Sequence, residues 1–249
     1  LIVEIPSEDH ILVVPQYMGT AFELAYDDAL NSVDDYANGR MGILDIGGGT
    51  ILINTSNCLN PAPMGAERFE GVQTLIKLIA EKINSTKLFT IERLLREGSA
   101  TGNYIYRPSR NTSDLRNISS LVQKSIEDYT RFTVAPLVTE NFPDIENVDF
   151  IVITGGGANI IDKAALLDEI GQDYFDRLVF ITSSELANVR GFYKYAVLIW
   201  NGSGEIQSPE RVELVVSVPS QEVVTEKVSI SEPNPDYSEQ LKQVQDNLK

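Results

Sequence analysis

The chain has 249 residues, 43% of them hydrophobic, which is enough for one large domain or two modest ones with a substantial core. Twenty Lys and Arg stand against 36 Asp and Glu, and the resulting net charge of −16 argues against direct binding of nucleic acid. The single cysteine and the single histidine exclude an intrachain disulfide, a zinc site built from cysteines and a histidine-dependent catalytic triad.

The sequence shows no sign of membrane insertion or export. Its longest uninterrupted apolar runs, such as 195–200, are far shorter than the ~20 residues that cross a bilayer. The first six residues lack the basic segment and the small-residue cleavage site of a secretory signal. We therefore expect a cytoplasmic protein that does not associate with membranes.

The first part of the chain predicts three strands and one helix. A short buried strand at 10–15 precedes a helix at 20–37 that carries acidic residues on its outer side. Two further strands, 41–46 and 51–54, are separated only by the glycine-rich segment 47–50. This arrangement predicts a hairpin whose turn exposes bare backbone.

The middle of the chain is predominantly helical in pattern. Apolar residues at helical spacing predict helices at 71–83 and, more briefly, at 91–95. Residues 98–111 are polar and irregular. The longest helical pattern runs over 115–138, and we expect Pro136 to end it early.

The last third repeats the order of strand, glycine turn and helix. A strand at 148–153 leads through the turn 154–158 into a helix at 160–170, followed by a strand at 178–181 and a helix at 186–200. Helices that alternate with mostly buried strands predict an α/β fold.

Residues 205–249 differ from the rest in composition. They contain nine acidic and four basic residues, four prolines and no glycine. Segments 212–218 and 223–230 alternate like edge strands, and 237–248 has the pattern of a weak helix. We interpret 205–249 as an acidic appendage, and the sequence leaves open whether it is docked on the core.

The segment from Asp45 to Thr50 has the composition of a phosphate-binding turn. Because Gly47, Gly48 and Gly49 have no Cβ, backbone N–H groups in the turn can approach phosphate oxygens closely. A carboxylate beside phosphate requires a divalent cation between them, so Asp45 is a candidate ligand for Mg²⁺, held through water, and Thr50 can add a hydroxyl. The alternative is a tight hairpin turn capped by Asp45.

The segment Gly155, Gly156, Gly157 and Ala158 joins a strand to a helix, where a nucleoside can approach the backbone closely. It is not a dinucleotide-binding fingerprint, because Ile160 stands where the third glycine belongs, and the chain contains no Gly-Lys-Ser/Thr loop. The alternative is a tight connection without a ligand.

The order of Gln16 after Pro15, the turn 45–50 and the turn 155–158 resembles the actin-like ATPase superfamily. In that family the first turn corresponds to the phosphate-2 motif and the second to the adenosine motif. The segment 185–194 is similar to the second helix that connects the two large domains, and 71–142 resembles the ParM-type bacterial actins that segregate plasmids.

The resemblance implies an actin-like, ribonuclease-H-like nucleotide-binding fold with a small helical insertion at about 88–115. It divides the chain into the end of a first domain with a connecting helix (1–40), a second domain with the insertion (41–184), a returning helix (185–204) and the acidic appendage (205–249). The family's first phosphate loop has no counterpart before Gln16, so we expect that these 249 residues alone do not hydrolyse nucleotide normally.

The resemblance also implies a ligand and roles for single residues. ATP or GTP with Mg²⁺ would bind between the two turns, Asp45 would hold the metal and Gln16 would orient the attacking water. Gly71 would border the adenine, although an ordinary place at the start of a helix is an equal alternative.

Three classes of function follow from the resemblance. The first is a polymerising nucleotidase whose partners are its own copies and a DNA-bound adaptor protein. The second is a non-polymerising relative such as a sugar kinase, a chaperone ATPase or an exopolyphosphatase, and the third is a structural adaptor that has lost nucleotide binding. The net charge of −16, taken over the whole chain, predicts that screening by salt or Mg²⁺ favours self-association.

Overall fold

The computed structural model describes residues 13–68, 70–109 and 114–200. All of them lie in the first of the two units into which the chain divides, Leu1–Pro209 and Glu210–Lys249. The strand predicted at 10–15 lies mostly outside the described residues, and the elements predicted within 205–249 lie wholly outside them.

The described part of the chain alternates helices and strands. The strands are β1 (Arg40–Ile46), β2 (Ile51–Asn57), β3 (Asn60–Arg68), β4 (Ile105–Tyr106), β5 (Arg116–Asn117), β6 (Phe150–Thr154) and β7 (Leu178–Phe180). The α-helices are α1 (Tyr17–Ala25), α2 (Asp34–Ala37), α3 (Val72–Lys82), α4 (Leu88–Gly98), α5 (Ser119–Tyr129), α6 (Ala135–Asn141), α7 (Lys163–Ile170), α8 (Gln172–Phe175) and α9 (Ala187–Trp200). Short π or 3-10 segments are η2 (Thr130–Val134), η3 (Ile145–Asn147), η4 (Gly156–Ile160) and η5 (Ser184–Leu186). Among these helices none is both long enough and apolar enough to cross a membrane.

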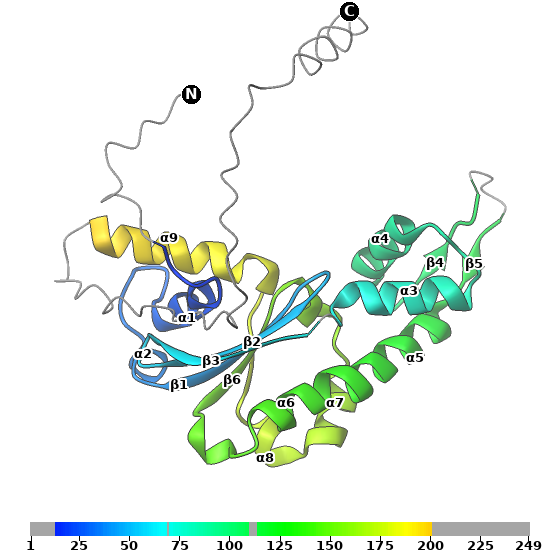
Figure 1. Cartoon of the computed structure of the whole chain (residues 1–249). Helices are drawn as coiled ribbons and strands as arrows, with labels where there is room; N and C mark the ends of the chain where they lie inside the picture. The colour runs from blue at the N-terminus through cyan, green and yellow to red at the C-terminus, as the bar shows by residue number, and fades with distance from the viewer. Residues whose placement is uncertain (1–12, 69, 110–113, 201–249) are drawn as a thin grey trace, which may run out of the picture. The chain divides into compact units, whose positions relative to one another are not determined.

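A five-stranded sheet in the order β3-β2-β1-β6-β7 forms the centre (Figure 1). β1 pairs antiparallel with β2, and β2 pairs antiparallel with β3, whereas β1, β6 and β7 run parallel. Helices α1 and α9 lie on one face of the sheet, and α5 to α8 lie on the other. This mixed sheet with helices on both faces confirms the predicted α/β class, and the predicted hairpin of β1 and β2 is confirmed with it.

The pleat of β1 divides its side chains between two cores. Leu44 and Ile46 belong to the large core that also contains residues of α3, α5, α6 and α7. Met41 and Ile43 belong to a second core with α1. Because successive side chains alternate along a strand, Asp45 is directed to the same face as Met41 and Ile43, towards α1.

Helices α1 and α9 pack with their backbones in close approach. A Cβ on Gly191 of α9 would overlap the carbonyl group of Gly19 and would lie 2.7 Å from the backbone nitrogen of Glu23 in α1. A Cβ on Gly19 would in turn come within 2.7 Å of the Cα of Asn188. These two glycines therefore set the distance between the helices.

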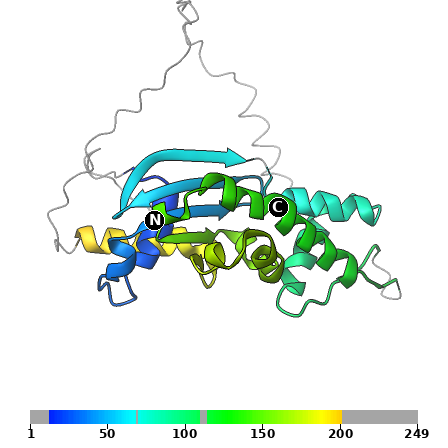
Figure 2. The same cartoon turned by 90° about the horizontal axis from the view of Figure 1, so that it is seen from below.

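Helices α3 and α4, the β4–β5 hairpin and α5 form a helical lobe, residues 72–129. Figures 1 and 2 show α3, α4 and the hairpin beyond the glycine turn that ends β1. The lobe shares the large core of the sheet, to which it contributes Leu75, Ile79, Ile91, Leu95, Val122 and Ile126. The insertion predicted at 88–115 covers α4 and much of the hairpin.

The prediction of one helix at 20–37 is wrong. The Asp27 carboxylate accepts the backbone N–H groups of Ala29 and Asn31 at 2.9 and 2.8 Å, which stabilises a turn in place of a helix. Leu30 in this turn has a positive φ of 65°, which a continuous helix does not allow.

The prediction that Pro136 ends the long helix is also wrong. The helix begins at Ser119, passes through the π-helical segment η2 and continues as α6 to Asn141. Pro136 lies in the first turn of α6, where its missing N–H and fixed φ are tolerated.

Strand β3 was not predicted, because its sequence is atypical of a strand. It contains Pro61, Pro63 and Gly65, and it lies at the edge of the sheet, where proline is tolerated. The turn from β2 to β3 is made by Cys58 and Leu59 with φ values of 48° and 60°, in the region usually taken by glycine or asparagine.

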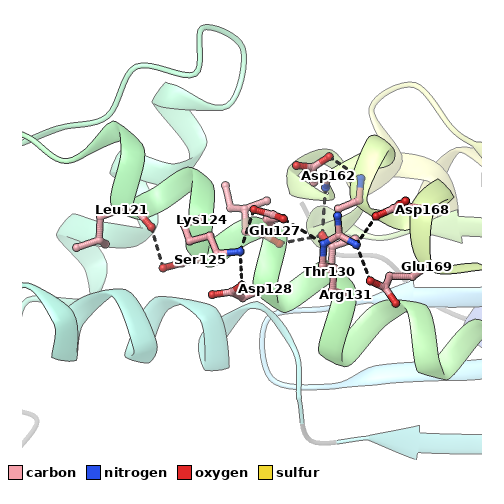
Figure 3. Close-up of polar contacts among 12 residues, drawn as sticks. Leu121, Lys124, Ser125, Glu127, Asp128, Thr130, Arg131, Asp162, Asp168 and Glu169 are labelled. Carbon is pink, nitrogen blue, oxygen red and sulfur yellow. Dashed lines mark hydrogen bonds and ion pairs between the residues drawn. The ribbon is translucent and has the colours of Figure 1, made fainter.

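The π-helical segment η2 anchors the long helix on α7 (Figure 3). Arg131 lies 2.7 Å from the Asp168 carboxylate and also pairs with Glu169. The buried Thr130 hydroxyl accepts the backbone N–H of Asp162 at 3.1 Å. Thr130 thus holds the start of α7 and Arg131 holds its end, so one turn of the long helix also fixes the short segment between η4 and α7.

The close approach of α1 and α9 predicts that a single methyl group added between these helices greatly lowers the stability of the fold. Gly191→Ala should lower the free energy of unfolding by about 3 kcal/mol, although alanine favours a helix, because the added Cβ overlaps the backbone of α1. Urea titration followed by circular dichroism measures the change. Gly49→Ala is the matched control, since a Cβ there has no atom within 4 Å; equal stability of the two variants would contradict the prediction.

Candidate functional site

The turn between β1 and β2 directs its carbonyl groups towards the start of α3. The N–H groups of Gly71, Val72 and Gln73 donate to the carbonyl oxygens of Gly49, Gly47 and Gly48 at 3.3, 3.0 and 2.8 Å. Within the described residues, the N–H groups of Gly48 and Gly49 donate to no other residue. The turn, and not the start of the helix, therefore offers free donors to an anion.

Gly71 allows the turn and α3 to meet. A Cβ on Gly71 would lie 2.6 and 2.7 Å from the carbonyl oxygens of Gly48 and Gly47. The preceding residue is held as well, because the buried Tyr129 hydroxyl donates to the carbonyl oxygen of Glu70 at 2.8 Å, and burial raises the pKa of this hydroxyl. Gly71 thus acts through backbone packing and does not line the cavity between the two glycine turns.

The second glycine turn packs against the end of β1. Gly155 has a positive φ of 81°, and a Cβ there would overlap the Asp45 carboxylate. A Cβ on Gly157 would overlap the side chain of Ile46, and Ala158 is buried in the large core. The two turns are adjacent because β1 and β6 are parallel neighbours and end side by side.

A cavity of about 810 Å³ opens between the two turns and the lobe. Its volume lies within the range typical of sites for small molecules and cofactors. On the lobe side its wall includes the ion pair of Glu92 and Arg96, separated by 2.6 Å, and on the other side Asn159 donates to Glu185 at 2.9 Å. The lining residues are Gly47, Gly48, Val72, Gln73, Ile76, Glu92, Leu95, Arg96, Ser99, Ala100, Gly156, Gly157, Asn159, Ile160 and Glu185.

Asp45 is buried behind the turns and is held by two amides. Its Oδ2 accepts the Nε2 of Gln16 at 3.1 Å and the Nδ2 of Asn188 at 3.0 Å. The Oδ1 of Asn188 accepts both the backbone N–H and the hydroxyl of Thr20, at 3.0 and 2.8 Å. Strand β1 and helices α1 and α9 therefore meet at one carboxylate.

The charge of Asp45 has no cationic partner among the described residues. Within the same ranges, no group of three or more His, Cys, Asp or Glu side chains could hold a metal by itself. Magnesium in nucleotide sites commonly takes one or two carboxylates, with water and phosphate oxygens as its other ligands. A single unneutralised carboxylate beside a turn with free N–H groups fits that mode of binding.

The residues singled out in the sequence fall into two groups around the cavity. Gly47, Gly48, Gly156 and Gly157 line it. Gly49, Thr50, Gly71, Gly155, Ala158, Gln16 and Asp45 lie behind or beside these and do not line it. Sequence reasoning missed Asn188, although it lies within the segment 185–194 that resembles a connecting helix, and it missed the wall formed by α4.

Comparison with known proteins identifies the family. Residues 40–180, more than half of the chain, match the Alp7A C-terminal domain family. The chain belongs to this family. Among curated proteins, none matches the chain in sequence.

Solved structures with the same fold are distant in sequence. Actin-like protein Alp7A superposes with a TM-score of 0.62 at 16% identity over 75% of this chain and 53% of its own. Bacillus thuringiensis ParM with ATP gives 0.52 at 15% identity over 74% and 54%, and the archaeal actin homologue Ta0583 gives 0.55 at 18% over 75% and 55%. The chain spans about half the length of these proteins.

These comparisons confirm the actin-like fold and the resemblance to the ParM and Alp7A proteins. The five-stranded sheet and the helices on its two faces are the part of that fold present in the described residues.

The amide network around Asp45 predicts that Asn188 stabilises the fold. Asn188→Ala should lower the free energy of unfolding by about 2 kcal/mol, because it leaves a buried carboxylate and the Thr20 donors with fewer partners. Urea unfolding measures this, and Asn159→Ala, which removes an exposed hydrogen bond to Glu185, is the control expected to change stability little. A loss at Asn188 no greater than in the control would contradict the role of the network.

Proposed function

We propose that the cavity binds ATP or GTP together with Mg²⁺, with the phosphates towards Gly47–Thr50 and the nucleoside towards Gly155–Ala158. The observation that carries this proposal is that both glycine turns line one cavity, with the free N–H groups of Gly48 and Gly49 beside it. Structures of ParM from Bacillus thuringiensis contain ATP, AMPPNP and ADP, which supports a nucleotide as the ligand.

The walls of the cavity suit the polar edges of a nucleoside. Apolar side chains of α3 and α4, Ile76 and Leu95, are combined with Ser99 and the Glu92–Arg96 pair on one side, and Asn159 and Glu185 lie on the other. A small number of polar groups on a mostly apolar surface is the usual composition of such sites.

We assign Asp45 to the metal and Gln16 to water. Magnesium, when bound, would neutralise phosphate charge, and Asp45 would hold it through its hydration shell. Gln16 lies at the start of α1, where its amide reaches the Asp45 carboxylate, so the same amide is available to orient a water molecule. Asn188 fixes the carboxylate from the opposite helix.

In the complete protein, we propose that nucleotide binding controls assembly into filaments that segregate plasmid DNA in the cytoplasm. Membership of the Alp7A C-terminal domain family and the likeness to ParM support this role. The excess of acidic residues favours a DNA-bound adaptor protein over direct contact with DNA.

The decisive experiment is a titration of the full-length protein with fluorescently labelled ATP and GTP, with Mg²⁺ and with EDTA, accompanied by light scattering. We expect saturable binding that weakens in EDTA and scattering that rises with the bound nucleotide. A protein that binds neither nucleotide contradicts the proposal. One that stays monomeric and phosphorylates a small sugar has the function of a kinase.

Two substitutions at Gly48 separate charge from shape. A Cβ at this position has only the side-chain amide of Gln73 nearby, at 4.0 Å, so Gly48→Ala should keep the affinity for nucleotide within about threefold. Gly48→Asp should lower the affinity by tenfold or more, about 1.4 kcal/mol, because a carboxylate then faces phosphate. The labelled-nucleotide titration measures both, and equal affinities would show that phosphate does not lie at this turn.

Asp45→Asn tests the metal site with little change in shape. The side-chain oxygen of asparagine can still accept from Gln16 and Asn188, so we expect the fold and nucleotide affinity in EDTA to be retained. In the full-length protein, release of phosphate in the presence of Mg²⁺ should fall by about 100-fold or more, because the cation loses its carboxylate. Phosphate release and thermal unfolding are the measurements, and unchanged turnover would place the metal elsewhere.

A further inference from the structure

The first glycine turn offers an anion only uncharged donors. The N–H groups of Gly48 and Gly49 donate to no other described residue, and the segment 47–50 contains no Lys or Arg. Among the described residues that line the cavity, the one basic side chain is that of Arg96, which pairs with Glu92 on α4 at 2.6 Å. Phosphate oxygens at this turn would therefore depend on a metal ion and on hydrogen bonds from neutral groups.

The backbone at the start of α3 does not supply these hydrogen bonds. A helix commonly binds an anion through the free N–H groups of its first turn. In α3, however, the N–H groups of Gly71, Val72 and Gln73 donate to carbonyl oxygens of the glycine turn, and that of Thr74 donates to the carbonyl oxygen of Gly71. An anion in the cavity can therefore reach the first turn of α3 only through a side chain.

Gln73 is the side chain of α3 that lies beside the glycine turn. It is the second residue of the helix, where the Cα–Cβ bond tilts towards the helix N-terminus and thus towards the turn. Apart from adjoining residues, the nearest atom to a Cβ on Gly48 would be the Nε2 of Gln73, at 4.0 Å. Gln73 is exposed and lines the cavity together with Gly48. An amide donor and the free N–H groups of the turn therefore border the same space.

The other polar side chains of the cavity wall come from different elements. The Glu92–Arg96 pair belongs to α4, and Asn159 of η4 donates to Glu185 of η5 at 2.9 Å. These four side chains are thus already paired with one another. Within the ranges that the structure describes, the side-chain amide of Gln73 has no hydrogen-bond partner, so it is available to a ligand.

We propose that the side-chain amide of Gln73 donates to a phosphate oxygen of the bound nucleotide, beside the N–H groups of Gly48 and Gly49. The inference rests on the proposed function, because it names a further group that holds the phosphates in the same cavity. A hydrogen bond to a charged oxygen is about twice as strong as one between neutral groups. Loss of this single amide should therefore be measurable in the affinity for nucleotide.

A contact with phosphate has an effect that depends on the phosphates of the ligand. A nucleoside has no phosphate, so loss of the Gln73 amide should leave its affinity unchanged. A triphosphate loses a hydrogen bond and should bind more weakly. An amide that faced the base or the ribose would instead affect the nucleoside and the triphosphate equally, and an amide that faced only solvent would affect neither ligand.

Two substitutions of Gln73 in the full-length protein test the contact. Gln73→Leu removes the donor, and Gln73→Glu replaces it with a carboxylate of nearly the same shape. Displacement of labelled ATP or GTP by adenosine, ADP and ATP, and by guanosine, GDP and GTP, gives the affinities. In both variants the affinity for the nucleoside should stay within about twofold, whereas the affinity for the triphosphate should fall about tenfold with leucine and further with glutamate.

A neighbouring substitution separates the position of the side chain from its charge. Thr74 is the next residue of α3, is exposed and does not line the cavity. Thr74→Glu adds the same charge as Gln73→Glu and should lower the affinity for the triphosphate by less than about threefold, because the added carboxylate is screened by solvent. Thermal unfolding of the three variants should match that of the unmodified protein, since both residues are exposed.

Several results would overturn the inference. They are an unchanged affinity for the triphosphate in both Gln73 variants, equal losses for nucleoside and triphosphate, and a loss in Thr74→Glu as large as in Gln73→Glu. A higher affinity of Gln73→Glu for the triphosphate in Mg²⁺ would also overturn it, because the side chain would then face the metal. An unmodified protein that binds nucleotide, with any of these results, contradicts only the role of Gln73. One that binds no nucleotide contradicts the proposed site and the inference with it.

Discussion

Three backbone hydrogen bonds between the first glycine turn and the start of α3 determine much of the structure. They occupy the carbonyl groups of Gly47, Gly48 and Gly49, whereas the N–H groups of Gly48 and Gly49 donate to no other described residue, and Gly47 and Gly48 line the cavity. They also occupy the first N–H groups of α3, which fixes where this helix begins. The lobe begins with α3, so the location of the cavity between the lobe and the turns depends on this contact. Gly71 makes it possible, because any side chain there would meet the same carbonyl groups.

The Asp45 carboxylate connects the sheet to the helices on one of its faces. The pleat of β1 directs Asp45 away from the large core, and the close packing of α1 on α9 brings Gln16 and Asn188 to it from two helices. Its amide partners satisfy hydrogen bonds without neutralising the charge. A buried carboxylate in this state is costly unless a cation completes it, and a metal bound as we propose would connect the packing of the helices to the nucleotide site. A shift of α9 relative to α1 would therefore alter the geometry of Asp45 directly.

The parts of the fold that depend on local pattern could be predicted from the sequence. Glycine turns after buried strands identified β1, β2 and β6 and one wall of the cavity, because strand alternation and missing Cβ atoms are local properties. The break after α1 depends on the side chain of Asp27 competing for backbone N–H groups. The long helix continues through Pro136 because this proline lies in the first turn of α6, directly after a π-helical segment. The opposite wall of the cavity contains Glu92 and Arg96 of α4, which is far in sequence from the glycine turns. The contact of Asn188 with Asp45 also joins residues far apart in sequence. No local pattern therefore predicts either feature.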